Sequence, residues 1–137
     1  MKKVINPKSI SPPASTYHHA ILSQGISDLL TISGQLGEYP DGTCAKGAGA
    51  QAEQAWANVK GILDEADMRL DDIVKVTSYI VGEENIDAYV SMHREILGDM
   101  TPPWTLVVVS ALGRARYLVE VDVLAARTIG KPDNEDC

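Results

Sequence analysis

The sequence predicts an α+β fold in the order β-β-α-β-α-β-β, with both helices on one face of one sheet. Apolar residues recur at helical spacing over two segments, residues 48–66 and 86–97. Runs rich in β-branched residues, typical of strands, flank these segments. At 137 residues the chain has the size of a single domain. Within it we expect an arm over 1–15, a core over about 16–127 and a flexible tail over 128–137.

The first third of the chain is expected to supply the arm, two strands and a long loop. Residues 1–15 are rich in Pro and Ser and lack periodicity, which favours an extended segment. Residues 17–22 and 29–35 are predicted strands, joined by a turn at Gly25. Residues 36–49 form a loop that contains the turn sequence Pro-Asp-Gly and has room for one short strand.

Two amphipathic helices and three further strands are predicted after this loop. The apolar positions of the first helix are Ala52, Ala55, Trp56, Val59, Ile62, Leu63 and Ala66. Those of the second helix are Ile86, Tyr89, Val90, His93, Ile96 and Leu97. Asn85 is a candidate N-cap of the second helix, and Gly98 is a candidate for its end. Strands over 73–81, 105–112 and 117–126 complete the sheet.

The sheet face opposite the helices is predicted to be too apolar for contact with water alone. Two helices cover one face of a sheet of this size. The strand residues Val107, Val109, Val121 and Val123 are assigned to the face that remains uncovered. An exposed apolar face of this kind marks an assembly surface. The pattern therefore predicts an oligomer.

Composition argues against several classes of protein. The chain has 12 basic and 19 acidic residues, a net charge of −7, which disfavours contact with nucleic-acid phosphates. Arg114 and Arg116 are the only close basic pair away from the termini, and a solvated turn explains them. No apolar run is long enough to span a membrane, and Met1–Ser11 lacks the apolar segment of a secretory signal. We therefore expect a cytoplasmic protein, with Cys44 and Cys137 as free thiols.

The histidines predict no metal site. His18 and His19 are adjacent, so on a strand their side chains would point to opposite faces. His93 lies on the apolar stripe of the second helix, where we expect a hydrogen-bonded core or interface histidine. The serines do not form the Gly-x-Ser-x-Gly element that exposes a nucleophile in hydrolases.

Several short motifs, collinear over roughly residues 10–127, resemble the YjgF/RidA family. They are Tyr17-His18-His19-Ala20, Ser33-Gly34-Gln35, Asn58, Asp71-Asp72-Ile73-Val74-Lys75-Val76-Thr77, Pro102-Pro103-Trp104-Thr105 and Val119-Glu120-Val121-Asp122. The resemblance implies a chorismate-mutase-like fold and a homotrimer with a barrel-like core and ligand clefts at the subunit boundaries. It also implies hydrolysis of reactive enamines or imines, such as 2-aminoacrylate, to ketoacids and ammonia without a cofactor. Older family names refer to endoribonuclease activity.

The resemblance also implies roles for individual residues. Glu120 matches the glutamate that acts on the attacking water, and is the candidate catalytic residue. Tyr17 and Ser33 match residues that line the ligand cleft. Thr105 stands where the family usually has Ser, and Val90 where the second helix usually carries an asparagine. We therefore expect Tyr17, Ser33 and Thr105 to contact the ligand.

Trp104 occupies the place of the arginine that pairs with the substrate carboxylate in the family. Arginine binds a carboxylate through two charge-assisted hydrogen bonds, whereas tryptophan has one uncharged donor. Two readings stay open. In one, Trp104 is an apolar wall or a cation–π surface for a larger, less anionic ligand. In the other, it fills the cleft and the site is vestigial. Arg116, from the neighbouring turn, is a further candidate for ligand binding.

Glu120 has both a catalytic and a structural reading. A buried carboxylate gains a raised pKa, can position water and can move a proton. Asp122, two residues further on, is expected to share its sheet face. The structural alternative is an ion pair of Glu120 with Arg114 or Arg116.

Three functions are therefore compared. The first is hydrolytic deamination of an enamine or imine unlike 2-aminoacrylate. The second is a module of the same fold that binds a small metabolite without chemistry. The third is a ribonuclease, which the acidic composition and the lack of a basic, aromatic platform disfavour. A required Glu120 distinguishes the first function from the second.

Overall fold

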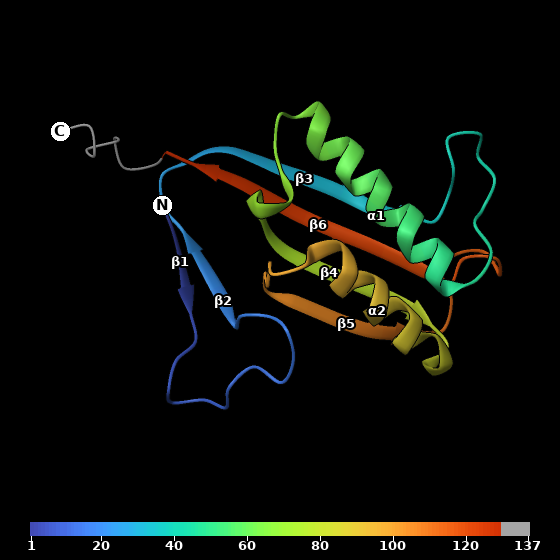
Figure 1. Ribbon diagram of the computed structural model, residues 1–137, viewed down its shortest axis with the longest axis horizontal. Coiled ribbons are helices and arrows are strands. Elements are labelled where there is room, and N and C mark those ends of the chain that lie inside the picture. Colours follow the sequence, from blue (N-terminus) through green and yellow to red (C-terminus); the bar gives the residue numbers. More distant parts are fainter. Residues whose placement is uncertain (130–137) are drawn as a thin grey trace.

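The computed structural model describes residues 1–129 and shows a four-stranded sheet, two α-helices and a separate two-stranded ribbon (Figure 1). The strands are β1 Lys2–Ile5, β2 Ala20–Ser23, β3 Ile26–Leu36, β4 Ile73–Val81, β5 Trp104–Val109 and β6 Val119–Thr128. The helices are α1 Ala48–Glu65 and α2 Ile86–Leu97, with short 3₁₀ turns at Leu70–Asp72 and Glu83–Asn85. The α+β class is confirmed. Residues 130–137, most of the predicted tail and Cys137 among them, lie outside the described residues.

The main sheet has the strand order β3-β6-β4-β5. β6 pairs antiparallel with both β3 and β4, so the last strand of the chain is a central one. β4 and β5 are parallel, and α2 forms the crossover between them. Figure 1 shows α1 over β3 and β6 and α2 over β4 and β5, both on the same face. The opposite face of the sheet, here called the open face, carries no helix.

The helices and β4 agree with the sequence prediction to within one residue, whereas the N-terminal region does not. Residues 2–5, predicted as part of an unpaired arm, pair with residues 20–23 and form the ribbon. The strand predicted over 17–22 begins only at Ala20, because the backbone N–H groups of the two preceding histidines bond elsewhere. The amide of His18 donates to the Thr101 carbonyl at 3.1 Å, and that of His19 donates to Asn6 Oδ1 at 2.8 Å.

Smaller differences occur at the other boundaries. The strand predicted over 105–112 starts at Trp104 and ends at Val109, and that predicted over 117–126 runs from Val119 to Thr128. The loop over 36–49 contains one isolated bridge, between Glu38 and Cys44, in place of a short strand. Gly98 ends α2 with φ at 59°, whereas Asn85 occupies the N-cap position without a capping side-chain bond.

The core lies between the helices and the sheet. It includes Ile32, Trp56, Val59, Leu63, Val76, Ile80, Tyr89, Val119, Val121 and Val123. The assignment of Val121 and Val123 to the uncovered face is therefore wrong, because both side chains face the helices and are at most 2% exposed. Val107 and Val109 do lie on the open face, in register with Tyr79 and Val81 of β4. The prediction of an apolar uncovered face holds for β5.

Gln51 of α1 fixes the loops at one end of the sheet. Its Nε2 donates to the carbonyl of Ala45 at 3.0 Å and to that of Arg116 at 2.8 Å. Its Oε1 accepts from the N–H of Leu118 at 2.8 Å. Since Gln51 is buried, these bonds are shielded from water and hold the start of β6 against the helix. The side chain of Glu120 therefore leaves the sheet from a rigid position.

Candidate functional site

Two carboxylates, Glu120 and Asp122, project from β6 onto the open face. In the β4–β6 register Glu120 lies opposite Tyr79, and Asp122 lies opposite Thr77. The Tyr79 hydroxyl donates a hydrogen bond to Asp122 Oδ2 at 3.0 Å, diagonally across the two strands. The predicted sharing of one face by Glu120 and Asp122 is confirmed.

A β-bulge in β3 lets Glu120 approach the backbone of that strand. Ile32 pairs with Val123 and Gln35 with Val121, so the two residues between them, Ser33 and Gly34, oppose Asp122 alone. A Cβ atom added to Gly34 would lie 2.1 Å from Glu120 Oε2. The Glu120 carboxylate therefore occupies the space that any other residue at position 34 would fill.

The surroundings of Glu120 favour an acid–base group. Burial raises the pKa of its carboxyl, and the negative charge of Asp122 raises it further. Within residues 1–129 the ion pairs are Lys2–Asp72, Arg69–Asp71 and Arg127–Asp28. The structural alternative, a pair with Arg114 or Arg116, is thus not formed in this part of the chain. Glu120 is half-buried.

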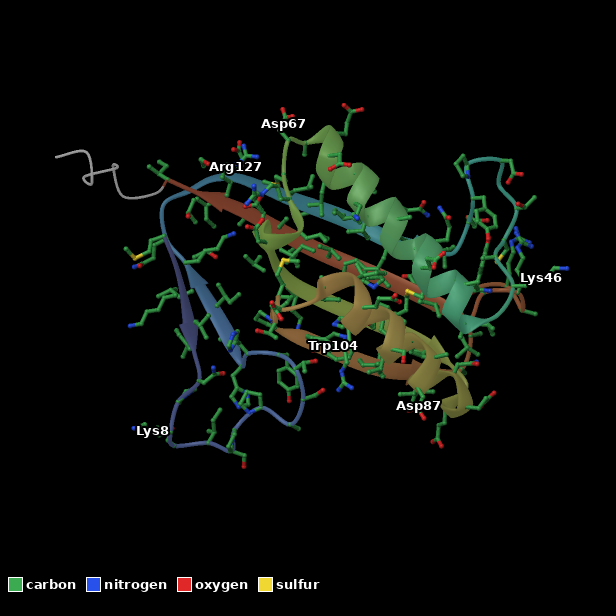
Figure 2. The ribbon with its side chains drawn as sticks, in the orientation of Figure 1. Lys8, Lys46, Asp67, Asp87, Trp104 and Arg127 are labelled. Carbon is green, nitrogen blue, oxygen red and sulfur yellow. The ribbon has the colours of Figure 1, made fainter. Side chains whose placement is uncertain are left out.

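Trp104 lies on the other side of the sheet from Glu120. Its indole ring stacks on the imidazole of His93 in α2, with centroids 3.8 Å apart and planes 16° apart. Figure 2 shows Trp104 at the place where α2 lies over β5. The indole Nε1–H donates to the Ser78 hydroxyl at 2.9 Å. Trp104 is thus packed against the helix-covered core.

The hydrogen bond of Trp104 begins a buried chain of donors and acceptors. The Ser78 hydroxyl donates to the Tyr89 hydroxyl, which also accepts from the indole of Trp56 at 3.3 Å. The Tyr89 hydroxyl then donates to His93 Nδ1 at 3.2 Å. Burial raises the pKa of Tyr89 to about 12 and lowers that of His93 to about 4, with a further lowering of the His93 pKa by Arg94. Both groups are therefore neutral at pH 7, and His93 is the hydrogen-bonded core histidine that the sequence predicts.

Thr105, the next residue, faces the open side. Its hydroxyl accepts a hydrogen bond from Lys75 Nζ at 2.8 Å. Lys75 lies on β4 and takes part in none of the ion pairs of residues 1–129. The open face therefore carries a cation on β4 as well as the two carboxylates on β6.

Tyr17 belongs to the loop between β1 and β2, which packs near the start of β5. The Tyr17 hydroxyl accepts from the backbone N–H of Ala14 at 3.2 Å, and its ring meets His19 edge-on. Arg94 of α2 holds this loop by donating to the Ser15 hydroxyl at 3.0 Å. Because residue 18 also bonds to Thr101, three residues before Trp104, Tyr17 belongs to the Trp104 end of the sheet.

The predicted site residues form two groups within one chain. Tyr17, Trp104 and Thr105 make up the first group, here called the aromatic half-site, and Ser33 and Glu120 make up the second, the carboxylate half-site. Trp104 pairs with Val76 and faces the helices, whereas Glu120 pairs with Tyr79, three residues further along β4, and faces the open side. Thr105 shares the open face with Glu120 but lies on β5, two strands away from β6. One chain therefore does not bring Trp104 and Glu120 together.

Arg116 lies at the carboxylate end. Its guanidinium donates to the Tyr117 hydroxyl at 3.1 Å, and that hydroxyl donates to Glu38 Oε2 at 2.8 Å. The residue comes just before β6, whose first residue pairs with Ile80 near the end of β4, whereas Trp104 begins β5 beside Val76. Within one chain, Arg116 therefore lies away from the position where the family resemblance implies an arginine.

The other reactive side chains form no cluster. No group of three or more His, Cys, Asp or Glu residues suited to a metal occurs within residues 1–129. His18 Nδ1 pairs with the Asn6 amide and His19 Nε2 with the Ser11 carbonyl, so these neighbours serve different contacts. Cys44 is a free thiol. None of the helices in the described part of the chain has the length and apolar character needed to cross a membrane.

Sequence reasoning overlooked Tyr79, Lys75 and the steric role of Gly34. The alternation of residues 73–81 places Lys75, Thr77 and Tyr79 on one face, which is a usable signal. That signal does not reveal which strand lies beside β4. The pairing of Tyr79 with Glu120 depends on the sheet order, and the order is visible only in the structure.

The fold is that of the Rid proteins. The crystal structure of the Rid family protein YyfB from Yersinia pestis matches with a TM-score of 0.79 at 26% identity, covering 92% of this chain and 98% of that one. RidA from the Antarctic bacterium Psychrobacter matches with a TM-score of 0.70 at 26% identity, covering 91% and 99%.

The chain belongs to the YjgF/RidA family. The family model described as endoribonuclease L-PSP matches residues 8–127. The RutC family protein of Pyrococcus horikoshii is 31% identical over 127 residues, which are 91% of this chain and 98% of the relative. The RutC family protein YjgH of Escherichia coli is 35% identical over 100 residues, which are 72% of this chain and 75% of the relative.

Proposed function

We propose that the protein is a homotrimer that hydrolyses a reactive enamine or imine, unlike 2-aminoacrylate, in clefts between its subunits. The observation that carries the proposal is the Glu120 carboxylate, half-buried on the open face, outside the ion pairs of residues 1–129 and held against Gly34. A carboxylate in this setting can bind water and accept its proton.

The chemistry needs only water and a proton carrier. Glu120 accepts a proton from water as the water oxygen bonds to the carbon of the C=NH group, and returns that proton to nitrogen, which gives a neutral carbinolamine. Glu120 then accepts the proton of the new hydroxyl group and passes it to nitrogen as the C–N bond breaks, so that ammonia leaves as the carbonyl forms. No electrons are exchanged with an outside group, so the reaction requires no cofactor. The raised pKa of Glu120 suits both steps, because the group must accept and then release a proton.

The separation of the two half-sites supports a site shared between subunits. Trp104 and Glu120 lie on opposite faces of one sheet, on strands that are separated by β4. The open face also exposes large apolar side chains: Leu29 is 59% exposed, Leu124 39% and Val107 37%. Such a surface favours burial in an assembly. In the proposed homotrimer, with a barrel-like core, the aromatic half-site of one subunit meets the carboxylate half-site of its neighbour.

Trp104 directs the choice of substrate. Its indole Nε1–H already donates a hydrogen bond to Ser78, and its ring stacks on His93. Trp104 therefore offers no donor to a substrate carboxylate. Loss of a charge-assisted hydrogen bond costs on the order of 1.5–3 kcal/mol. We therefore propose that the preferred imine carries a larger, apolar substituent, and that Tyr17, Ser33 and Thr105 line its cleft.

The packing of Trp104 also favours the second function, a small-metabolite-binding module without catalysis. A side chain committed to the core leaves the cleft without its anchor, and Val90 removes a further polar group from α2. A ribonuclease is the weakest of the three proposals. The net charge of −7 and the two carboxylates of the open face repel phosphates.

The test generates imines in situ with an amino-acid oxidase and follows the ketoacid and ammonia that appear. Apolar imines should be hydrolysed faster than 2-aminoacrylate. Glu120→Gln keeps the volume but removes the base, and should reduce the rate by at least about a hundredfold while sedimentation still shows a trimer. The binding module would be identified by a trimer that binds imine analogues and hydrolyses imines no faster with Glu than with Gln at position 120.

A further inference from the structure

Tyr79 and Asp122 form a fixed pair beside Glu120. The Tyr79 hydroxyl reaches diagonally past its direct neighbour, Glu120, to bond Asp122 Oδ2 at 3.0 Å. This bond raises the pKa of Tyr79, with smaller effects from burial and from the charges of Asp122 and Glu120. Asp122 is therefore the carboxylate of the two that accepts a hydrogen bond from a neighbouring side chain.

Glu120 is confined from three directions. On β3 its carboxylate lies against Gly34, which has no side chain to move aside or to donate a proton. On β4 its neighbour is the Tyr79 ring, and on β6 the nearest charge is Asp122. Arg114 and Arg116, in the loop before β6, form no ion pair with it, and Lys75 bonds Thr105 of β5. Within residues 1–129, Tyr79 and Asp122 are thus the titratable groups that adjoin Glu120.

We propose that Tyr79 and Asp122 are positioning residues that keep Glu120 as the single free acid–base group of the site and set the pH range in which it works. The inference rests on the proposed function of Glu120. Its physical basis is distance. A carboxylate tethered by a phenol stays at a constant separation from its neighbour, so its negative charge always opposes ionisation of Glu120. An untethered Asp122 would rotate into solvent, where its charge is screened, or would compete with Glu120 for the attacking water molecule.

The first measurement needs no turnover. In the intact trimer, ¹³C-labelled glutamate carboxyl signals are titrated by NMR, with the Glu120 signal assigned by its loss in Glu120→Gln. Asp122→Asn should lower the pKa of Glu120, because it removes the neighbouring charge and keeps the shape. Tyr79→Phe should lower it less. The effect of Asp122→Asn should also shrink in the Tyr79→Phe background, because the two residues act as a pair.

A matched control separates the pair from the overall charge. Asp64→Asn removes the same charge from an exposed position on α1, on the helix side of the sheet. This variant should leave the titration of Glu120 unchanged. Equal shifts in Asp64→Asn and Asp122→Asn, or no shift in Asp122→Asn, would overturn the inference.

The second measurement is the pH profile of kcat/KM for the imine that is turned over. Since the ionised carboxylate is the base, activity falls as pH drops through the Glu120 pKa. Asp122→Asn should move this acidic limb to lower pH, with the rate on the plateau changed by only a few fold. An unmoved limb, in a protein that Glu120→Gln inactivates, would overturn the positioning role and keep the proposed function. Full activity of Glu120→Gln would overturn the proposed function, while the NMR titration still decides the positioning role.

Discussion

The imidazole of His93 and the indole of Trp104 lie face to face, 3.8 Å apart between ring centroids, across the interface of α2 and β5. A chain of three hydrogen bonds, through the hydroxyl groups of Ser78 and Tyr89, joins the same two residues by a second route. Trp104, at the position where the family resemblance implies an arginine, is therefore held both through the face of its ring and through its Nε1–H group. Its side chain is part of the packed core.

Trp104→Arg should destabilise the protein and should not restore carboxylate binding. The guanidinium would lose the stack on His93 and would lie near Arg94, while Ser78 would lose its donor. Removal of a large core aromatic costs about 3–5 kcal/mol, and we expect a loss of at least about 2 kcal/mol because Trp104 is partly exposed. Urea denaturation measures the change. Trp104→Phe, which keeps the stack and loses only the hydrogen bond, should cost about 1 kcal/mol. Equal stability of the Arg variant and the native protein would contradict this account.

Acidification should weaken the fold through His93. Its pKa is about 4 in the folded protein against an ordinary 6.5, so between these values the unfolded chain holds a proton that the folded chain lacks. The free energy of unfolding should therefore rise with pH from about 4 to 6.5, and acidification through this window should remove on the order of 3 kcal/mol. Denaturation curves at a series of pH values measure this dependence.

The control for this prediction compares two histidines. His93→Gln should be less stable at pH 7.5 and should lose the part of the pH dependence that lies above pH 5, where most carboxylates no longer titrate. His19→Gln, in the β1–β2 loop, should keep it. The same slope in His93→Gln as in the native protein would assign the pH dependence to other groups.

Charging the open face should separate assembly from folding. Val107 lies on that face and is 37% exposed, whereas Val121 faces the helices and is fully buried. Val107→Asp should give a folded monomer by sedimentation and circular dichroism. Val121→Asp should prevent folding of the chain itself, because an unpaired buried charge costs several kcal/mol. A trimeric Val107→Asp variant would show that this part of the face lies outside the subunit contact.

Gly34→Ala should impair the site far more than the fold. The new Cβ would lie 2.1 Å from Glu120 Oε2 and 2.9 Å from Glu120 Cγ, so the carboxylate must move. A displacement of about 1 Å costs roughly a hundredfold in rate. Gly61→Ala is the matched control, since Gly61 lies within α1 and a Cβ added to it would meet nothing within 4 Å. The control should keep activity and gain up to about 1 kcal/mol of stability. Retained activity in both variants would show that the position of the Glu120 carboxylate does not matter for the reaction.

The parts of the fold that could be predicted are those in which short-range periodicity determines the structure. The apolar stripe of α1 and the β-branched run of β4 locate both elements, because each pattern identifies the buried face by itself. β1 could not be found this way, since its four residues are stabilised by pairing with residues 20–23, after a loop without periodicity. The side of the sheet to which Val121 points could not be predicted from the sequence either, because it depends on which strands flank β6 and on the bulge in β3.

The candidate site was predictable in its residue types and less so in its geometry. The alternation of β6 correctly places Glu120 and Asp122 together. Motif matching locates position 104, but it does not say on which side of β5 the side chain lies. That choice follows from contacts with Ser78 and His93, which are 26 and 11 residues away along the chain. The Tyr79–Asp122 bond likewise joins two strands whose adjacency no local pattern encodes.

The central position of β6 has a consequence for the order in which this protein forms during synthesis. β3 and β4 are both complete long before β6, yet each takes its partner from residues 119–128. Until the ribosome has released that segment, β3 lacks its partner in the main sheet and the apolar side of α1 has only part of a sheet beneath it. Contacts this distant along the chain also carry a high loop-closure cost. The nascent chain therefore gains its stable structure in one late step, after residues 119–128 have left the ribosome.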